Sequence, residues 1–593
     1  MTVVENTRPA PDALPASGLR PPADVMRLAR LGSFHQCRLS FMRTLLRRLK
    51  RERWTFDRPV FDIDARGVGT AVYSAHGPER SYSLVCFAHD LPPDQRSDRV
   101  IAEAWDSTFT LFDGVPSEDD IERLSWNVPK QEAGRITSSE ISLSRANRSV
   151  RLFDHVVERL AAGQQPNRDK IESIGYLMRT TAVYGSGKFG AVDREAISDR
   201  PEFKGPFQAE MLSVFLTRAY VLDLVEHLAR CHSPETAVPI DPSLRRRFGV
   251  GNSTGLGMAP FIVNHPVLLN NWIAAREEAL ARVRGLANAE AEEITAFKTF
   301  VVRAKRNAEE WSSEHSLQIQ KLTMLRADLS RLEQRVAAGD LEGEMPWDRL
   351  FLWAEGNLSI EGQEQLVSLM LEPYGDLVDD LAERMGADED IAFHIDGGML
   401  LDELRVLVDD VYGWALSIDW TSPESLSRVW YVSEEKLEPR LGERFEEPIE
   451  PYEQPLAPGR DAAAMAQDID KWTGHSTVAA FLLVHPEHRH IARRAQIAKT
   501  FPYAEIRDNT ISSALLPIDL LRCKLSFFGA THFDPRSDRW IRINMFRDAP
   551  FPHELATCDS DDWCYPPVPA AHVGQETPVT PAAPKVTRVR DAP

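Results

Sequence analysis

Apolar and polar residues alternate between Trp54 and about Phe112. In the stretch PVFDIDARGVGTAVYSAHGPERSYSLVCFAHDL, Val, Tyr and Phe recur with a period close to two, and glycines interrupt the runs. Such alternation is typical of half-buried strands, and glycine is typical of the turns between them. The pattern predicts three antiparallel strands, and the following AWDSTFTLFDG is a candidate for a fourth.

A helical period follows from about residue 116. The segment SEDDIERL begins with Ser and acids, as a capped helix does, and FQAEMLSVFLTRAYVLDLVEHLARCH predicts a long buried helix. Further along, apolar residues settle into alternating steps of three and four, which is heptad spacing. These residues are Leu317, Leu322, Leu325, Leu329, Leu332 and Val336. They predict an antiparallel helical hairpin or a short coiled coil, which could be the seam of a homo-oligomer through 317–336.

Towards the other end of the chain, CKLSFFGATHFDPRSDRWIRINMF predicts two strands around a DPRSD turn. We therefore expect an α+β fold that is predominantly helical, with antiparallel strands near both chain ends and a large helical middle. The expected regions are a disordered arm (1–23), a basic helix with antiparallel strands (24–115), a helical region with candidate site loops (116–285), a long helical hairpin with further helices (286–445), a Pro-rich acidic linker (446–461), an α+β region (462–564) and a disordered tail (565–593).

Composition narrows the class of protein. A chain of 593 residues that is 43% hydrophobic is too long for one ordinary domain. Its net charge of -20 repels nucleic acids and anionic lipid, so we expect no nucleic-acid partner. The six cysteines form no CxxC pair, and neither a signal peptide nor an apolar run long enough to span a bilayer is visible. These features favour a cytoplasmic protein.

The segment from residue 24 to residue 53 departs from the acidic average. Nine Lys and Arg residues lie between Arg27 and Arg53, and apolar residues among them recur at roughly helical spacing. A basic amphipathic helix, or a pair of helices, is predicted. It could dock an anionic partner such as a membrane surface, or it could pack against the acidic body of the chain itself, which is the reading that the net charge favours.

The stretch FGVGNSTGLGMAPFIVNHP, 248–266, is the first candidate for chemistry. Its glycines permit positive φ and close approach to a ligand, and successive N–H groups in such a loop can bind an oxyanion. A helix that begins at Pro266 would add its positive end. Asn252, Ser253, Thr254 and Gly255 are therefore predicted to bind an anion, and His265 is a candidate general acid or base.

This loop is similar to the Gly-Ser-Ser-x-Met-Pro catalytic loop of the fumarase and argininosuccinate lyase superfamily. The resemblance covers only the loop, and it implies a helical enzyme that binds an anion there. The Lys and the Asn-Pro that usually follow in that family are missing, and the strands predicted before the loop do not fit it. The chain is not assigned to that family.

Two more segments carry cations that could hold an anion. In MRTTAVYGSGKFGAVDR, Lys188 lies among glycines and Arg179 precedes it, although this is not a Walker A loop. In SSEISLSRANRSVR, Arg145, Arg148 and Arg151 recur at three-residue steps, which would put them near one face of a helix. The structural alternative is a turn that ends a helix for the segment with Lys188, and a solvated charged helix face for the segment with Arg145.

Histidines supply the remaining candidates. His532 lies beside the predicted C-terminal strands, where loops often carry function, and is a second candidate catalytic residue. His485 and His488 in VHPEHRH could share a helix face and bind a metal. Because no HExxH motif and no second group of ligands is visible, the sequence predicts no metal site, and it identifies no cofactor.

The leading hypothesis is an enzyme that acts on a small phosphorylated or carboxylated metabolite by general acid/base chemistry, with a lyase or a transferase favoured. The predicted loops at 184–190 and 249–265 would converge on one pocket. The alternative is a non-catalytic oligomeric scaffold that docks an anionic partner through its basic N-terminal helix.

Overall fold

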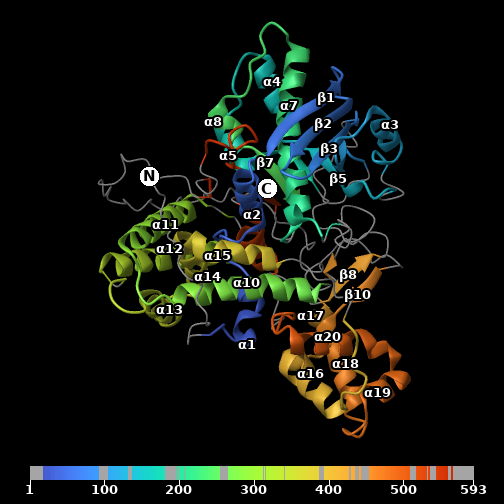
Figure 1. Cartoon of the computed structure of the whole chain (residues 1–593), viewed down its shortest axis with the longest axis vertical. Helices are drawn as coiled ribbons and strands as arrows, with labels where there is room; N and C mark the ends of the chain where they lie inside the picture. Colours follow the sequence, from blue (N-terminus) through green and yellow to red (C-terminus); the bar gives the residue numbers. More distant parts are fainter. Residues whose placement is uncertain are drawn as a thin grey trace, which may run out of the picture.

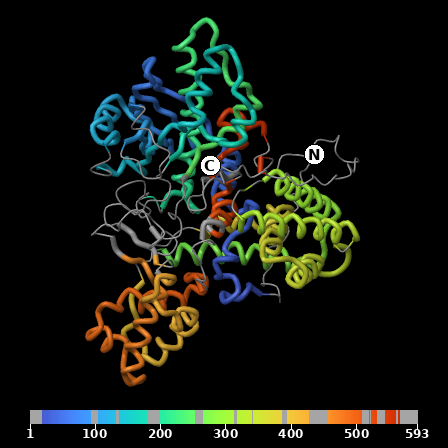
Figure 2. The backbone as a smooth tube through the Cα atoms, turned by 180° about the vertical axis from the view of Figure 1, so that it is seen from behind, coloured from blue at the N-terminus to red at the C-terminus, as the bar shows by residue number. Residues whose placement is uncertain are grey.

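The computed structural model describes most of the chain. The described residues are 18–92, 104–130, 136–180, 197, 199–205, 207–253, 265–311, 313, 316–339, 341–385, 393–426, 429–433, 440–441, 453–507, 516–530, 532–534, 542–558 and 563–564. The fold has a sheet with its covering helices, a body of helices beside it, and a smaller helical unit at the far end (Figures 1 and 2).

One large sheet has the order β1-β2-β3-β4-β5-β6-β7-β12-β11. Its strands are β1 (Thr55–Ile63), β2 (Gly69–His76), β3 (Ser81–Ala88), β4 (Ser107–Asp113), β5 (Glu140–Arg148), β6 (Tyr176–Thr180), β7 (Gly249–Ser253), β11 (His532–Asp534) and β12 (Arg542–Met545). Neighbouring strands are antiparallel, except that β6 and β7 run parallel to each other. The four strands predicted between residues 54 and 113 are confirmed, and each pairs with the next.

The predicted fold class is wrong. The strands do not form antiparallel sets near the two chain ends; seven of them lie in succession between residues 55 and 253, and the sheet is mixed. Three of these, β5 to β7, lie where a helical region was expected. In β5 the three-residue spacing of arginines suggested a helix, but Ile141 and Leu143 alternate with polar residues, and pairing with β4 makes this segment a strand.

Helices cover both faces of the sheet. The long α7 (Gln208–His232), which was predicted as a buried helix, packs against one face. On the other face α3 (Glu118–Asn127) buries Leu124 against Val72, Val85 and other strand residues. α3 begins at the predicted cap, where the Ser117 hydroxyl accepts from the Asp120 N–H and the Asp120 carboxylate accepts in return. Three shorter helices adjoin the sheet: α4 (Phe153–Ala161), α5 (Arg168–Ile174) and α8 (Pro242–Arg245).

A body of helices lies beside the sheet (Figure 1). It contains α10 (Pro266–Arg284), α11 (Ala291–Glu310), α12 (Ser316–Ala337), α13 (Pro346–Asn357), α14 (Ile360–Met370), α15 (Gly375–Val378) and the short η4 (Glu372–Tyr374) and η5 (Asp379–Met385). α11 and α12 form an antiparallel hairpin, since Lys305 pairs with Glu333 and Arg326 bonds back to the Trp311 carbonyl. The apolar heptad residues from Leu322 onward are buried within the chain, where α12 contacts α11 and α14.

A smaller helical unit has its own apolar core. Its helices are α16 (Leu401–Leu416), α17 (Pro423–Leu426), α18 (Pro458–Ile469), α19 (Val478–Val484), η8 (Pro486–His488) and α20 (Arg489–Thr500). A three-stranded sheet adjoins it, with β8 (Trp430–Ser433), β9 (Arg440–Leu441) and β10 (Glu453–Leu456). The later part of the predicted 446–461 linker is therefore strand β10 and the start of α18.

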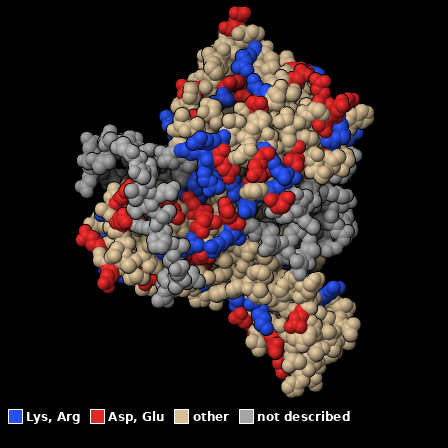
Figure 3. All heavy atoms as spheres, in the orientation of Figure 1, with Lys and Arg blue, Asp and Glu red and all other residues tan. Residues whose placement is uncertain are grey.

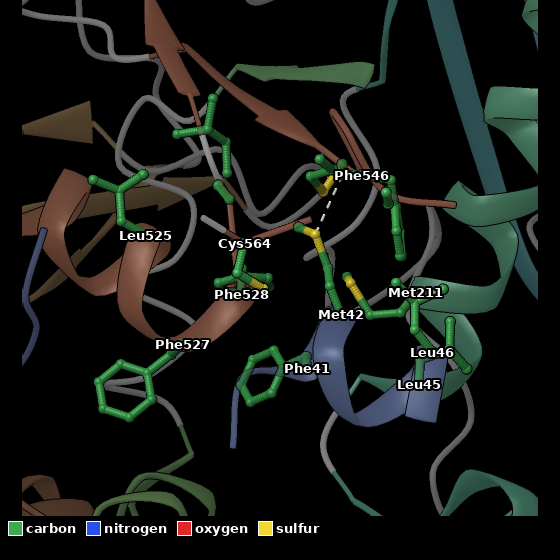
Figure 4. Packing of buried hydrophobic residues seen from close by; sticks show 14 of the residues in the cluster. Phe41, Met42, Leu45, Leu46, Met211, Leu525, Phe527, Phe528, Phe546 and Cys564 are labelled. Atoms are coloured by element: carbon green, nitrogen blue, oxygen red, sulfur yellow. Dashed lines mark hydrogen bonds between the residues drawn. The ribbon is translucent and has the colours of Figure 1, made fainter. Parts of the chain in front are cut away.

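The N-terminal segment lies between the sheet and the helical body. It contains α1 (Pro22–Val25), η1 (Leu28–Arg30) and α2 (Phe41–Arg51), so only its last part is the predicted basic helix. It packs on α21 (Leu516–Cys523) and on the π-helical turn η9 (Lys524–Phe528). In Figure 4, Phe41 and Met42 of α2 meet Phe528 of η9 and Phe546, whose N–H points to the Met42 sulfur at 3.4 Å.

Candidate anion-binding site

The parallel pair β6 and β7 positions the two loops that were predicted to carry the site. Thr180 and Asn252 are register partners at the carboxyl ends of these strands, so the segments after residues 180 and 253 depart from adjacent points. In sheets with parallel strands, ligands bind outside such carboxyl ends. Lys188, Thr254 and Gly255 lie outside the described residues, and Ser253 is described only in its backbone.

A row of polar positions crosses the sheet at this place. Asn147 of β5 pairs with Arg179 of β6, Arg179 with Gly251 of β7, Gly251 with Asn544 of β12, and Asn544 with His532 of β11. Register partners share a face of the sheet. Asn147, Arg179 and Asn544 are all buried, with at most 2% of each exposed. This polar row therefore includes two predicted site residues, Arg179 and, by its backbone register, His532.

Arg145 joins the same face. It lies two residues before Asn147 on β5, so the two side chains leave the strand in the same direction, and Arg145 is a diagonal neighbour of Arg179. The guanidinium of Arg145 stacks on the ring of Trp105 at 4.0 Å. The fold thus brings together two of the predicted anion-binding cations from segments 34 residues apart (179 less 145). Arg148 lies on the opposite face, since β5 is a strand and not a helix.

The glycine in the middle of the row has a packing role. A Cβ atom on Gly251 would lie 2.7 Å from the ring of Tyr176, so this ring covers the glycine. The phenol oxygen of Tyr176 accepts a hydrogen bond of 3.2 Å from Arg151. Gly251 was expected to let a ligand approach the backbone. In the structure it admits an aromatic ring instead, and this ring becomes part of the polar face.

Two buried amide oxygens, one in the row and one on the opposite face, have no hydrogen-bond partner among the described residues. These are Asn544 Oδ1 and Asn252 Oδ1, respectively. The Asn252 amide nitrogen donates to the Thr180 carbonyl at 3.2 Å, which ties β7 to the end of β6. Asn252 shares its face with Thr180, opposite to Arg179. A buried acceptor left unpaired costs free energy, so these oxygens are places where a donor from a ligand or a water would bind favourably.

His265 lies at the start of α10, half-buried, where its carbonyl accepts from the Leu269 N–H at 3.0 Å. Two residues on, Val267 packs against Ile497 and Ala504 of the smaller helical unit. The next residues, Leu268 and Leu269, belong to the main core, so this helix end contacts both parts of the fold. The sequence placed His265 in the same loop as Asn252, but the segment 254–264 that joins them lies outside the described residues.

Sequence reasoning assigned no role in the site to Asn147, Tyr176 or Asn544. Their only signal was position in a strand: the alternation in WIRINMF already separates Asn544 from the apolar residues Ile543 and Met545. No local pattern shows that Asn544 pairs with Gly251, nearly 300 residues earlier (544 less 251 is 293).

A second concentration of charge is fully paired within the chain. Arg20 contacts Glu277 at 2.7 Å and Glu364 at 2.9 Å, and Arg30 also contacts Glu364. Burial alone would raise the pKa of Glu364, but the charges of Arg20 and Arg276 outweigh this effect and lower the pKa to about 2. Arg30 of the predicted basic segment thus binds an acidic residue of its own chain, together with Arg20 from the segment before it.

The six cysteines are all described and all free.

Comparison of the chain with protein-family models, with curated proteins and with solved structures finds no match. Among the described residues, no helix is both long enough and apolar enough to cross a membrane.

Proposed function

We propose that the chain is an enzyme that binds a small phosphorylated or carboxylated metabolite over the polar row of β5, β6 and β7. The observation that carries this proposal is the meeting of Arg145 and Arg179 on one face, beside the carboxyl ends of the only parallel strand pair among the described strands. Two guanidinium groups on one face suit a divalent anion, since each presents a planar fork of donors.

Because the chain is acidic overall, an anion site must be built from local cations and cannot rely on the general surface charge. Acidic and basic side chains are interspersed over the described surface in Figure 3, so an anion finds no broad basic field on that face. It would be held instead by local arginines and by polar groups taken out of water. In such surroundings a charge-assisted hydrogen bond is stronger than at the surface, because solvent screening is weak.

Of the two predicted proton carriers, His532 has the better support. Its register position lies in the polar row, three strands from Arg179, which corresponds to about 14 Å at the usual spacing of strands. Lyase or transferase chemistry remains the favoured class, with the arginines holding the anion and a histidine moving the proton. The cytoplasmic location stays a prediction.

No second function is proposed. The scaffold hypothesis rested on the heptad residues and on the basic N-terminal segment. The apolar heptad residues from Leu322 onward are covered by helices of the same chain, and Arg43 and Arg48 of α2 are buried. The buried heptad residues therefore do not support self-association through 317–336, where Ile319 and Met324 are large apolar side chains exposed to solvent.

The proposal is tested by thermal unfolding of the full chain with phosphorylated and carboxylated metabolites, on the wild type, Arg179→Lys, Arg145→Gln and the control Arg66→Gln. Arg66 is an exposed arginine that pairs only locally with Asp64. A bound anion at 100 times its Kd stabilises the fold by about 2.7 kcal/mol. We expect one class of anion to raise the midpoint of the wild type and of the control.

The Arg179→Lys variant keeps the charge but loses the planar fork, so its response should fall sharply, and Arg145→Gln should also respond less. If no anion shifts the wild type at millimolar concentration, the proposal fails. If an anion shifts all four proteins equally, it binds elsewhere and the polar row is not the site.

A further inference from the structure

A group of metal-ligating side chains lies at the surface of the smaller helical unit, far along the chain from the polar row. Asp468 is in the last turn of α18, His485 follows α19, and Glu487 and His488 belong to η8. One ligand atom from each of these four residues lies within 4.8 Å of the other three. We call these four residues the His-carboxylate cluster.

The separations within the cluster are close to those around a tetrahedral ion. His488 Nε2 lies 2.8 Å from Asp468 Oδ2, and His485 Nδ1 lies 3.2 Å from Glu487 Oε1 and 3.9 Å from Asp468 Oδ2. Four ligand atoms at about 2.0–2.2 Å from a tetrahedral zinc ion are about 3.3–3.6 Å apart from one another. These three separations lie on both sides of this range, and all four ligand atoms lie within 4.8 Å of one another, so the side chains would move by about 1 Å to close around an ion.

Packing holds the two imidazoles in these positions. The ring of His488 is parallel to that of Phe481, with an interplanar angle of 3°, and the ring of His485 lies 5.8 Å from that of His488. The second oxygen of Asp468 accepts from Lys471 at 2.7 Å, which leaves Oδ2 directed at the histidines. Ligands fixed before binding lose little conformational freedom when an ion arrives.

The cluster is also accessible. The side chain of His488 is 7% exposed, whereas those of Asp468 and His485 are each 24% exposed, so an ion can enter from solvent. Two imidazole nitrogens and two carboxylate oxygens form a set that suits borderline divalent ions of the zinc type. Magnesium and calcium prefer oxygen ligands alone, and copper(I) prefers sulfur.

We propose that the His-carboxylate cluster binds one divalent transition-metal ion of the zinc class. With four protein ligands the site is closed, as structural zinc sites are, and it clamps the end of α18 to the turn between α19 and α20. No local pattern indicates that Asp468 belongs to this group, because it lies on another helix, 17 residues before His485 (485 less 468). The proposal replaces the expectation of no metal.

The test uses the full chain, freed of metal with a chelator and titrated with Co²⁺, whose visible absorption reports tetrahedral coordination. Zn²⁺ is then added in competition. We expect one ion per chain and a higher midpoint of thermal unfolding when the ion is bound. The double variant His485→Ala/His488→Ala should bind more than about 100-fold more weakly, since loss of even an outer partner of a metal ligand costs about 10- to 100-fold.

Two further variants separate a lost site from a lost fold. Asp468→Asn keeps the shape of the side chain and should also weaken binding, while circular dichroism should remain that of the wild type. His490→Ala is the control for a neighbouring histidine that supplies no ligand, because its Nε2 contacts Asp461 at 3.1 Å and its Nδ1 contacts only the backbone carbonyl of Glu487. It should bind like the wild type. Absence of saturable Co²⁺ binding, or equal affinity in the wild type and the double variant, would overturn the proposal.

Discussion

The carboxylate of Glu372 accepts two hydrogen bonds from the guanidinium of Arg43, at 2.6 and 2.7 Å, and neither side chain is exposed to solvent. His35 Nε2 lies 3.4 Å from the same carboxylate. Burial alone would raise the pKa of Glu372, but the charge and the hydrogen bonds of Arg43 hold it well below its usual range. This pair joins α2 to η4, and hence the N-terminal segment to the helical body.

Removal of one partner should therefore be severe. We expect Glu372→Gln to lower the free energy of unfolding by about 3–5 kcal/mol, because the Arg43 charge would stay buried without its counter-ion. The control is Glu333→Gln, which breaks the pair of Glu333 with Lys305, whose side chains are 38% and 31% exposed. Its cost should be about 0–1 kcal/mol. Urea denaturation of both variants measures the difference, and equal losses would contradict a structural role for the buried pair.

Acid should weaken the fold through Glu364. Its pKa is about 2 in the folded chain, against about 4.3 in an unfolded one. Folding therefore favours the ionised form of this carboxylate. The stabilisation is present above about pH 4.3 and is lost as the pH falls towards 2. Glu364→Gln should be less stable at neutral pH and should lose less stability on acidification. Denaturation series between pH 7 and pH 3 measure this, and parallel curves for the two proteins would refute it.

Gly32 and Gly356 form a matched pair for backbone contacts. A Cβ atom on Gly32 would lie 2.5 Å from backbone atoms of Arg522 and Cys523, whereas one on Gly356 would meet nothing within 4 Å. We expect Gly32→Ala to destabilise the chain by about 1–3 kcal/mol, as overpacking does. Gly356→Ala, in an exposed turn of α13, should stabilise it by about 0.5–1 kcal/mol. The midpoint of thermal unfolding measures both changes. If Gly32→Ala unfolds at the same midpoint as the wild type, the contact with α21 is not tightly packed.

Substitutions at Leu325 and Met324 test whether the apolar heptad face of α12 packs within the chain or against a second copy. Leu325 is buried within the chain, while Met324 is 41% exposed. Leu325→Ala should cost about 2–5 kcal/mol by leaving a cavity, and Met324→Ala should stay within about 0.5 kcal/mol of the wild type. Denaturation and light scattering are measured together. Dissociation of an oligomer by Leu325→Ala, without loss of stability in the subunit, would restore the homo-oligomer hypothesis.

The pattern of apolar and polar residues predicted helices and strands correctly where one face of the element is buried in a core. The alternation of β1 to β4, the cap at Ser117 and the apolar run of α7 are all found in the structure. It failed at β5, where the spacing of Arg145 and Arg148 imitates a helix although pairing with β4 decides the outcome. The small sheet of β8, β9 and β10 was missed as well, because short strands in a Pro-rich stretch carry little pattern.

The candidate site was predictable only in part, for the same reason. The residue types that bind anions can be read from sequence, and Arg145 and Arg179 were named on that ground. Their common face follows from the register of β5 and β6, which no local pattern shows. The rest of the polar row depends on partners still farther along the chain, as for Gly251 and Asn544. Lys188, the cation given most weight in sequence, lies outside the described residues and stays a prediction.

The N-terminal segment also sets an order of events during synthesis. The Arg522 guanidinium donates to the Gly32 carbonyl across 490 residues of chain. At about 5–20 residues per second, a ribosome takes about 25–100 s to make that stretch. Until then the Gly32 carbonyl lacks this donor, although the acidic partners of Arg20, Arg30 and Arg43 are made earlier. The contact of Gly32 with α21 is therefore among the last to form, and a chain released early lacks it.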